Sequence, residues 1–477
     1  MENRQRTAVM YEAPIPIELP RPGLQLVLRR GASTLAAAGA EGALYIAGKL
    51  ARRSDRTVAR AARRTFERLG ATYVKFGQAV ASSPAMIPPA IAEEFRSCLD
   101  KGPPVPWAQV REIVQEDLGA PVDTLFAAFD RRPHAAASIA VVHRARLHDG
   151  REVAVKVLRP GMASVVAADL QVMEPFARFL ARQGIGEAGN AVAYLVGLRT
   201  QIAEELDLRN EVRTMAHFRA LFQAYGLERL VIPEVHAALC GPRVLTMEYI
   251  DGAPIDDLAK AREYGVDPRP LVRELLRAWV LTALRSAVFH ADIHAGNLFL
   301  MKDGRLAMLD WGIVARLDAD SQELFRALCE SALGREEAWD VVTRHIIRAQ
   351  GVLLQEGFAM SDDDVKGMVR MFMEPILTKP MKDVSMGALF MSPEQARELN
   401  HGEAAPKRSL RERWRQNRVI ARAFRKAMKA GHFEEEVQRQ TFLAAKQLIY
   451  LERYGRMYTP DEALLGDKAF LEMVLGE

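Results

Sequence analysis

Two short polar runs, joined by a segment that reads as a β-hairpin, constrain this chain more than any other feature. The first run is His290-Ala-Asp-Ile-His-Ala-Gly-Asn297, and the second is Asp310-Trp-Gly312. Between them, the Asp-Gly pair at 303–304 separates two mostly apolar stretches, a pattern typical of a tight hairpin turn. Because a hairpin folds the chain back on itself, we expect Asn297 and Asp310 to lie close together.

These runs supply the oxygen atoms that phosphoryl transfer requires. One carboxylate must orient the attacking hydroxyl, and further oxygen ligands must hold Mg²⁺ beside the phosphates. We therefore expect Asp292 to be the catalytic carboxylate, and Asn297 and Asp310 to bind Mg²⁺. The spacing is similar to that of a protein-kinase catalytic loop followed by Asp-Phe-Gly, with Trp311 in place of phenylalanine.

Two other interpretations of the first run remain open at this point. The aspartate and asparagine could simply cap turns in a structural loop. Alternatively, His290, Asp292 and His294 could be metal ligands of a hydrolase. That second interpretation needs a further histidine or carboxylate cluster, and none is evident in the sequence.

A lysine on a predicted strand is the second candidate. The run Val153-Ala-Val-Lys156-Val157 follows an Asp-Gly turn at 149–150, and a lysine among apolar residues is costly unless it is paired. In kinases such a lysine contacts the nucleotide phosphates and a glutamate on the following helix. The pattern does not choose among four acidic residues in this region, which are Glu204, Glu205, Asp207 and Glu211.

Two further runs are weak when they are taken alone. Where a kinase carries a glycine-rich phosphate loop, this chain reads Ala135-Ala136-Ala137-Ser138. Alanine resists the positive φ that glycine allows, so the loop should be stiffer and should contact phosphates differently. The run Tyr73-Val-Lys75-Phe-Gly77-Gln78 would otherwise be interpreted as an exposed helix.

The overall composition is that of a soluble globular protein. The chain has 477 residues, enough for two or three packed units, and its net charge of +4 argues against a general polyanion binder. Three scattered cysteines indicate neither a disulfide framework nor a zinc site, and they favour a reduced, cytoplasmic environment. The stretch 31–48 is rich in alanine and glycine with Glu41 in its middle, so we interpret it as a soluble or surface-lying helix.

The pattern of elements predicts an α+β fold. Helical spacing covers about 25–100, 107–118, 163–225 and 268–289, and strands are expected around the two Asp-Gly turns and at 231–235 and 243–249. The remaining C-terminal part reads as helices with loops. This order differs from the alternating pattern of a parallel α/β sheet.

Taken together, the motifs resemble the UbiB-type atypical kinases, also called the AarF or ADCK group, which carry an ABC1 kinase-like domain. The resemblance covers about residues 68–312. The runs that carry it are Lys75-x-Gly77-Gln78, Ala135-Ala-Ala-Ser138, Val-Ala-Val-Lys156, Glu205-x-Asp207 with Asn210-Glu211, Met247-Glu248-Tyr249, His290-x-Asp292-x-His294-x-Gly296-Asn297 and Asp310-x-Gly312.

The resemblance implies a two-lobe, protein-kinase-like fold with a helical extension at each end. It divides the chain into a basic leader (1–60), a helical extension with Lys-x-Gly-Gln (61–133), an N-lobe (134–250), a C-lobe (251–400) and a basic helical region (401–477).

It also implies roles for single residues. Lys156 would pair with Glu211 and hold the ATP phosphates, while Lys75 would approach Glu205 and Asp207 in a gate over the site. The remaining implied ATP contacts are Ala135, Ala136, Ala137, Ser138, Met247, Glu248 and Tyr249; Gly77 and Gln78 complete the gate.

The chain departs from the family pattern in the catalytic loop. Members often have proline where this chain has Ile293 and Ala295, and glutamine where it has Val141. The loss of two prolines predicts a less rigid loop, with an effect on turnover rather than on nucleotide binding.

The function that the resemblance implies is a Mg²⁺-dependent ATPase or atypical kinase that supports quinone or isoprenoid-lipid metabolism. The alternatives are a small-molecule phosphotransferase of the aminoglycoside-kinase type and a non-catalytic, nucleotide-gated scaffold. Basic stretches at 49–68 and 407–429 predict peripheral contact with anionic lipid at the inner membrane face, although a solvated surface or nucleic acid would also account for them.

Overall fold

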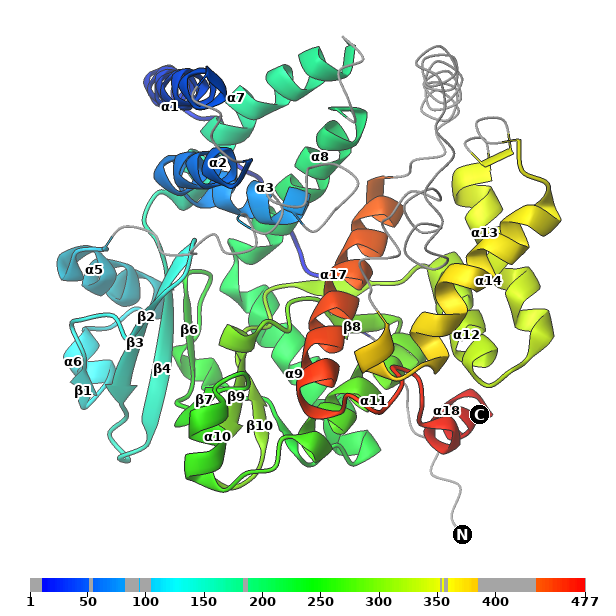
Figure 1. The fold of residues 1–477 in the computed structure, drawn as a ribbon. Helices are drawn as coiled ribbons and strands as arrows, with labels where there is room; N and C mark the ends of the chain where they lie inside the picture. The colour runs from blue at the N-terminus through cyan, green and yellow to red at the C-terminus, as the bar shows by residue number, and fades with distance from the viewer. Residues whose placement is uncertain are drawn as a thin grey trace. The chain divides into compact units, whose positions relative to one another are not determined.

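A computed structural model describes residues 11–50, 55–81, 94, 104–182, 188–351, 354–355, 359–384 and 435–476. The chain divides into two compact units. We call Tyr11–Val266 with Ala295–Ile313 the sheet unit, and Asp267–His294 with Val314–Glu477 the helical unit. Mainly antiparallel sheets combined with many helices confirm the α+β class (Figure 1). The basic stretch 407–429 lies outside the described residues.

A five-stranded sheet forms the centre of the sheet unit. Its order is β1-β3-β4-β6, with β2 also pairing with β3. The turn between β3 and β4 has Gly150 at φ 90°, where a side chain would be strained, and this confirms the first predicted hairpin. The bounds are β1 Ala128–Phe129, β2 Ala135–Ala136, β3 Ala140–Arg146, β4 Glu152–Leu158 and β6 Val244–Glu248.

Helix α5 (Trp107–Leu118) covers one face of this sheet. It buries Val110 and Val114 against the strand residues Val153 and Val155. The helix ends at Gly119, whose φ of 73° closes the last turn, so both predicted ends are confirmed. Because β4 is buried along almost its whole length, a polar group on it must find its partners inside the protein.

A second sheet has the order β5-β10-β9-β7. Its central pair is the second predicted hairpin, with Leu298 opposite Met308, and this prediction is confirmed. The predicted strand 231–235 is wrong in extent, because only its first residue continues the short strand β5, which pairs in parallel with β10. The bounds are β5 Leu230–Val231, β7 Gly252–Pro254, β9 Leu298–Met301 and β10 Leu306–Met308.

In the sheet unit, helices that precede the β3–β4 hairpin in the sequence pack against helices that follow it. Leu69 and Tyr73 from the N-terminal helices share a core with Val166, Leu170 and Ile202. This packing lays α3 against α8. The bounds are α1 Leu24–Leu50, α2 Asp55–Leu69, α3 Ala71–Ala81, α6 Val122–Leu125, α7 Met162–Arg182, α8 Ala188–Glu205, α9 Leu208–Tyr225 and α10 Leu258–Tyr264.

The stretch 31–48 lies within α1. In the part of the chain that the structure describes, neither α1 nor any other helix combines the length and hydropathy that crossing a bilayer requires. The proline-rich segment before α1 is held in place, because Ile15 exchanges two backbone hydrogen bonds with the Asn210 side chain of α9.

The helical unit is built around α11, whose residues are mostly buried. The predicted helix 268–289 is too long, since the chain turns at Ala287 (φ 53°) and then forms strand β8. β8 pairs antiparallel with β11. The bounds are α11 Arg269–Ser286, β8 Val288–His290, β11 Val314–Arg316, α12 Ala319–Ala332, α13 Glu336–Gly351, α14 Asp362–Thr378, α17 Glu435–Tyr458 and α18 Lys468–Leu475.

Strands β7 and β9 approach each other closely at Gly252, and a substitution there tests this packing. A Cβ atom on Gly252 would lie 2.7 Å from the Leu300 carbonyl oxygen, a contact that only a backbone shift relieves. We expect Gly252→Ala to destabilise the protein by about 2 kcal/mol, measured by thermal melting. Gly367→Ala on α14 is the control, because its Cβ meets open space and alanine favours a helix. Equal melting temperatures for the two variants would contradict the prediction.

Candidate functional site

A buried lysine shared by two carboxylates lies at the centre of the sheet unit. The Lys156 ammonium donates to both Glu211 carboxylate oxygens at 3.0 and 2.8 Å, and to Asp310 Oδ2 at 3.1 Å. Among the four acidic residues that the sequence left open, the structure therefore gives Glu211 as the partner of Lys156. We call these three residues the acid–lysine triad.

Three elements position this triad. Lys156 comes from the central strand β4, and Glu211 comes from the first turn of α9, whose N-cap is Asp207. Asp310 follows β10, and the backbone N–H of Gly312 donates to its Oδ1 at 3.0 Å. The backbone N–H of Trp311 donates to Glu211 at 3.3 Å, which ties the Asp-x-Gly turn directly to α9.

Trp311 anchors the same turn through its side chain. It is 1% exposed, and its indole N–H donates to the Met308 carbonyl at 2.8 Å. Its ring packs on Phe218 of α9, with the ring centroids 4.6 Å apart. The helix that carries Glu211 therefore also holds the residue that follows Asp310.

The triad has more negative than positive charge. Burial alone would lower the pKa of Lys156, but the charges of Asp310 and Glu211 outweigh it and hold that pKa above its usual range. Burial opposes ionisation of Asp310 as well, yet Lys156 and the Gly312 N–H keep its pKa well below the usual range. Burial raises the pKa of Glu211 to about 7 despite Lys156, so this carboxyl takes up a proton first.

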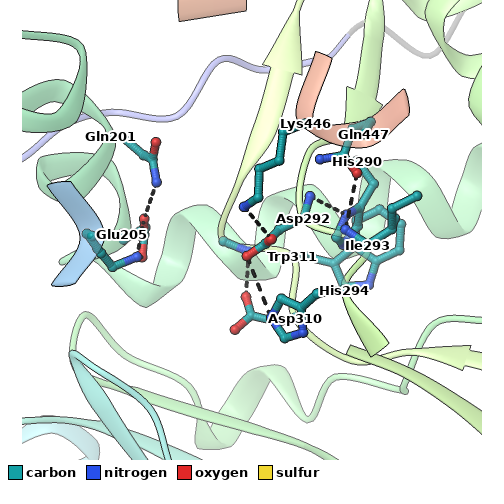
Figure 2. Close-up of polar contacts among 12 residues, drawn as sticks. Gln201, Glu205, His290, Asp292, Ile293, His294, Asp310, Trp311, Lys446 and Gln447 are labelled. Carbon is teal, nitrogen blue, oxygen red and sulfur yellow. Dashed lines mark hydrogen bonds and ion pairs between the residues drawn. The ribbon is translucent and has the colours of Figure 1, made fainter. Parts of the chain in front are cut away.

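A second ion pair lies beside the triad. The Lys75 ammonium on α3 donates to both Glu205 carboxylate oxygens at 2.9 and 2.7 Å. Gln201 donates a further hydrogen bond to Glu205 at 3.0 Å (Figure 2). A Cβ atom on Gly312 would lie 3.7 Å from Glu205 and 3.2 Å from Asp310, so this position requires a small residue. The charge of Lys75 also favours the ionised form of Asp310, which lowers its pKa further.

The other residues expected in the gate are placed differently. Asp207 accepts hydrogen bonds from the backbone and side chain of Arg209, and so it caps α9. Gly77 is buried on α3, and the Gln78 side chain lies outside the described part of the structure.

Asn297 lies directly before β9, in the same hairpin as the triad aspartate. The Leu309 N–H donates to the Asn297 carbonyl at 2.9 Å, so the hairpin places the backbone of Asn297 beside the residue that precedes Asp310. Asn297 is buried, with 8% of the whole residue exposed, whereas the Asp310 side chain is partly exposed. One amide oxygen and one carboxylate, close to a surplus of negative charge, form a donor set that fits Mg²⁺.

The alanine-rich loop is tethered by its own neighbours. Ala135 and Ala136 form β2, and the Ala137 carbonyl accepts from the Arg159 guanidinium at 3.2 and 3.0 Å. Ser138 is buried. Arg159 lies three residues after Lys156 on the chain, and no local pattern marked it as part of the site.

The segment Met247–Tyr249 continues the edge of the same sheet. The Glu248 N–H donates to the Glu234 carbonyl at 2.8 Å, and the Tyr249 N–H donates to the Glu152 carbonyl at 3.2 Å. Adenine contacts through these two N–H groups would therefore compete with bonds inside the protein. Met247 is buried, and it pairs with Ala154 on β4.

The helical unit contains the other polar run. Asp292 Oδ1 accepts from the Lys446 ammonium of α17 at 2.6 Å, and the Asp292 N–H donates to His290 Nδ1 at 3.0 Å (Figure 2). His294 Nε2 lies 3.8 Å from Asp292 Oδ2. Within the described residues, no cluster of three or more His, Cys, Asp or Glu side chains could hold a metal ion, so the alternative hydrolase site finds no support there.

Sequence reasoning missed the contribution of α17. Lys446 and Gln447 lie more than 150 residues after the loop that they contact, and their local pattern is that of an ordinary amphipathic helix. Neither residue carries a signal that could have been recognised without the fold.

The raised pKa of Glu211 predicts a dependence of stability on pH. A carboxyl whose pKa is higher in the folded than in the unfolded state stabilises the protein while the pH is below the unfolded-state pKa, which is near 4.5. This stabilisation is lost as the pH rises through the folded-state pKa of about 7. We expect the thermal stability of the wild type, relative to Glu211→Gln, to decline across this window by about 3 kcal/mol.

Thermal melts in metal-free buffer at several pH values measure this difference. The control is Glu228→Gln, which changes an exposed glutamate of the same unit and should give a curve parallel to the wild type. Parallel curves for Glu211→Gln and the wild type would contradict the account of the triad.

Comparisons with known proteins place the chain in a family. The profile of the ABC1 atypical kinase-like domain matches residues 97–340. A probable protein kinase UbiB of Azotobacter vinelandii is 32% identical over 88% of this chain and 72% of that protein. An uncharacterized chloroplastic aarF domain-containing protein kinase of Arabidopsis thaliana is 32% identical, over 85% of this chain and 73% of that protein.

An uncharacterized protein of Mycobacterium tuberculosis is 33% identical over 84% of this chain and 75% of its own length. A structure of another protein of that organism, in complex with erythromycin, covers 81% of this chain and 91% of that chain. Its identity of 25% comes with a TM-score of 0.44, which is too low to support a conclusion. The family profile and the relatives confirm the kinase-like fold, and this chain belongs to the family of ABC1 atypical kinase-like proteins.

Proposed function

We propose that this atypical kinase is a Mg²⁺-dependent ATPase, or phosphotransferase, that supports quinone or isoprenoid-lipid metabolism. Membership of the family supports ATP binding and kinase-type chemistry in general. The observation that carries the finer proposal is the acid–lysine triad, in which Lys156 lies between Glu211 and Asp310. The quinone or lipid role follows from the resemblance to UbiB-type proteins.

In this proposal each member of the triad has one task. Lys156 binds the phosphates, and Glu211 keeps its ammonium charged and holds it in place through hydrogen bonds. Asp310 and Asn297 hold Mg²⁺, which supplies charge neutralisation at the phosphate oxygens when it is bound. Ala135–Ser138 cover the phosphates, and Met247–Tyr249 contact the adenine.

Asp292 is proposed as the carboxylate that orients the attacking group, on the basis of its spacing of five residues before Asn297. A carboxylate in this role accepts the proton of water or of a hydroxyl acceptor as the new bond forms. Removing such a group typically costs about a hundredfold or more in rate.

The Lys75–Glu205 pair supports water or a small acceptor rather than a protein substrate. This pair sits on α3 and α8, directly beside Gly312 and Asp310. A helix fixed next to the metal-binding turn restricts access by a bulky acceptor. The pair therefore favours an ATPase over a protein kinase. The Lys-x-Gly-Gln extension, which supplies Lys75, and the alanine-rich loop together distinguish this chain from aminoglycoside-type phosphotransferases.

Turnover of ATP tests the proposal directly. We expect Asp310→Asn to lower Mg²⁺-dependent phosphate release by at least about a hundredfold, because it removes the charged metal ligand. Asp303→Asn is the matched control, since Asp303 lies in the same hairpin and pairs with Arg305 near the surface. The amount of lipid that co-purifies with the proteins should also differ between nucleotide-free and nucleotide-loaded samples.

Three results would decide among the candidates. Normal turnover by Asp310→Asn would contradict the metal site, and phosphorylation of a small molecule by radiolabelled ATP would favour the phosphotransferase. A wild type that binds Mg²⁺–nucleotide without turnover, combined with full cellular function of Asp292→Asn, would favour the scaffold.

Peripheral contact with anionic membranes is a second proposal, supported by an exposed apolar stripe. Leu24, Leu28 and Leu35 on α1 are 73%, 63% and 75% exposed, and their spacing puts them on one helix face. Helix α1 packs along α7, which exposes Phe176 and Phe179. Apolar side chains beside basic residues are typical of helices that lie on a lipid surface.

Flotation with anionic liposomes tests this second proposal. We expect reduced flotation for a variant with Leu24, Leu28 and Leu35 changed to serine, and for one with the arginines at 407–429 neutralised. Leu258→Ser, which changes an exposed leucine on α10, should float like the wild type. Equal flotation of all four proteins would contradict the proposal.

A further inference from the structure

Helix α17 contacts two consecutive residues of the catalytic loop through three polar side chains. Lys446 Nζ donates to Asp292 Oδ1 at 2.6 Å. Gln447 Oε1 accepts from the backbone N–H of Ile293 at 3.2 Å, and the Tyr454 hydroxyl donates to the Ile293 carbonyl at 2.7 Å. Both backbone polar groups of Ile293 are therefore held by the same helix.

The spacing along α17 accounts for this arrangement. Gln447 and Tyr454 are seven residues apart, almost two full turns, so they lie on one face of the helix. Leu443 and Leu451 lie on the same face, and all four residues are buried. Lys446 lies at the edge of this face, where its side chain is 20% exposed, close to the 19% of Asp292.

The contact differs from an ordinary surface ion pair. Surface pairs with mobile side chains contribute little, because ordering both partners costs entropy. Here the carboxylate is attached to a backbone whose next residue is already fixed by two hydrogen bonds. The backbone beside Asp292 therefore has little freedom, and the Lys446 contact restricts the side-chain torsions of Asp292 that remain.

Gln447 gives a second, independent sign that the contact serves the loop. Its side chain is fully buried, and among the described residues its Nε2 group finds no hydrogen-bond partner. Leaving a buried amide donor unpaired destabilises the folded state, so an apolar residue here would stabilise the packing better. The Ile293 N–H, however, needs an acceptor, because a buried donor without one is equally costly.

We propose that Lys446 is the positioning residue of the catalytic carboxylate Asp292, and that α17 braces the loop through Gln447 and Tyr454. Ile293 has the N–H that a proline at this position would lack, and Gln447 uses it. The rigidity that the loop sequence lacks is thus supplied by a helix about 150 residues later in the chain. This inference rests on the proposed role of Asp292 in catalysis.

The test compares charge removal with charge retention at one position. In the full-length protein, we expect Lys446→Met to lower kcat for Mg²⁺-ATP turnover by about tenfold to a hundredfold, with KM changed less than about threefold. Lys446→Arg keeps the cation and should recover kcat to within about threefold of the wild type. Lys366→Met is the matched control, because its ammonium also forms an ion pair in the helical unit, with Asp340 at 2.5 Å. Its kcat should stay unchanged.

Hydrogen–deuterium exchange provides a readout that does not depend on turnover. We expect Gln447→Leu to raise the exchange rate of the peptide that contains the Ile293 amide by at least about tenfold, since that amide loses its acceptor. A peptide from α12 in the same variant reports whether the unit as a whole has loosened, and its exchange should match the wild type.

The outcomes separate this inference from the proposed function. If the wild type turns over ATP and Asp292→Asn does not, an unchanged kcat in Lys446→Met overturns the inference and leaves the proposed function standing. Equal loss in the arginine and methionine variants also overturns it, because a merely steric role would not distinguish them. If the wild type shows no turnover, the proposed function fails, and the positioning role of Lys446 fails with it. Unchanged exchange at Ile293 in Gln447→Leu overturns the brace.

Discussion

One ammonium group shared by two carboxylates determines much of the structure of the sheet unit. Lys156 is buried on a central strand, where an unpaired charge would cost several kcal/mol. Glu211 and Asp310 neutralise it, and each of them is in turn fixed by backbone N–H groups of the Asp-x-Gly turn. Because the cation is outnumbered, the triad keeps a surplus of negative charge, which suits a site that binds a divalent cation together with phosphates.

Two helices fix the loops that bear the proposed catalytic groups. Helix α9 presents Glu211 from its first turn and packs Trp311 against Phe218, so the Asp-x-Gly turn cannot shift without the helix. In the helical unit, α17 holds Asp292 and Ile293 through side chains of its buried face. In both units, the proposed catalytic groups sit on loops that a helix from another part of the chain fixes by hydrogen bonds.

Local patterns predicted the helices and strands well wherever glycine-containing turns mark their ends. The Asp-Gly turns, Gly119 and the hairpin between Asn297 and Asp310 were predicted from residue types whose backbone preferences are strong. The errors fell where packing decides the outcome: the helix 268–289 ends early at Ala287, and the strand 231–235 is reduced to a short parallel pairing. The partner of Lys156 stayed open because the acidic candidates lie within eight positions of the chain, and their spacing did not reveal the break between α8 and α9 that separates them. Lys446 could not be found at all, because a contact across about 150 residues leaves no local pattern.

The most direct measurement is calorimetric binding of ATP with and without Mg²⁺. It compares the wild type with a protein in which Lys156→Met and Glu211→Gln are combined, a change that removes one cation and one anion and so leaves the buried net charge unchanged. The account predicts that the wild type binds ATP only in the presence of Mg²⁺, and that the double variant, with its fold verified by thermal melting, binds at least about tenfold more weakly. Equal affinity of the two proteins, or no binding by the wild type, would contradict it.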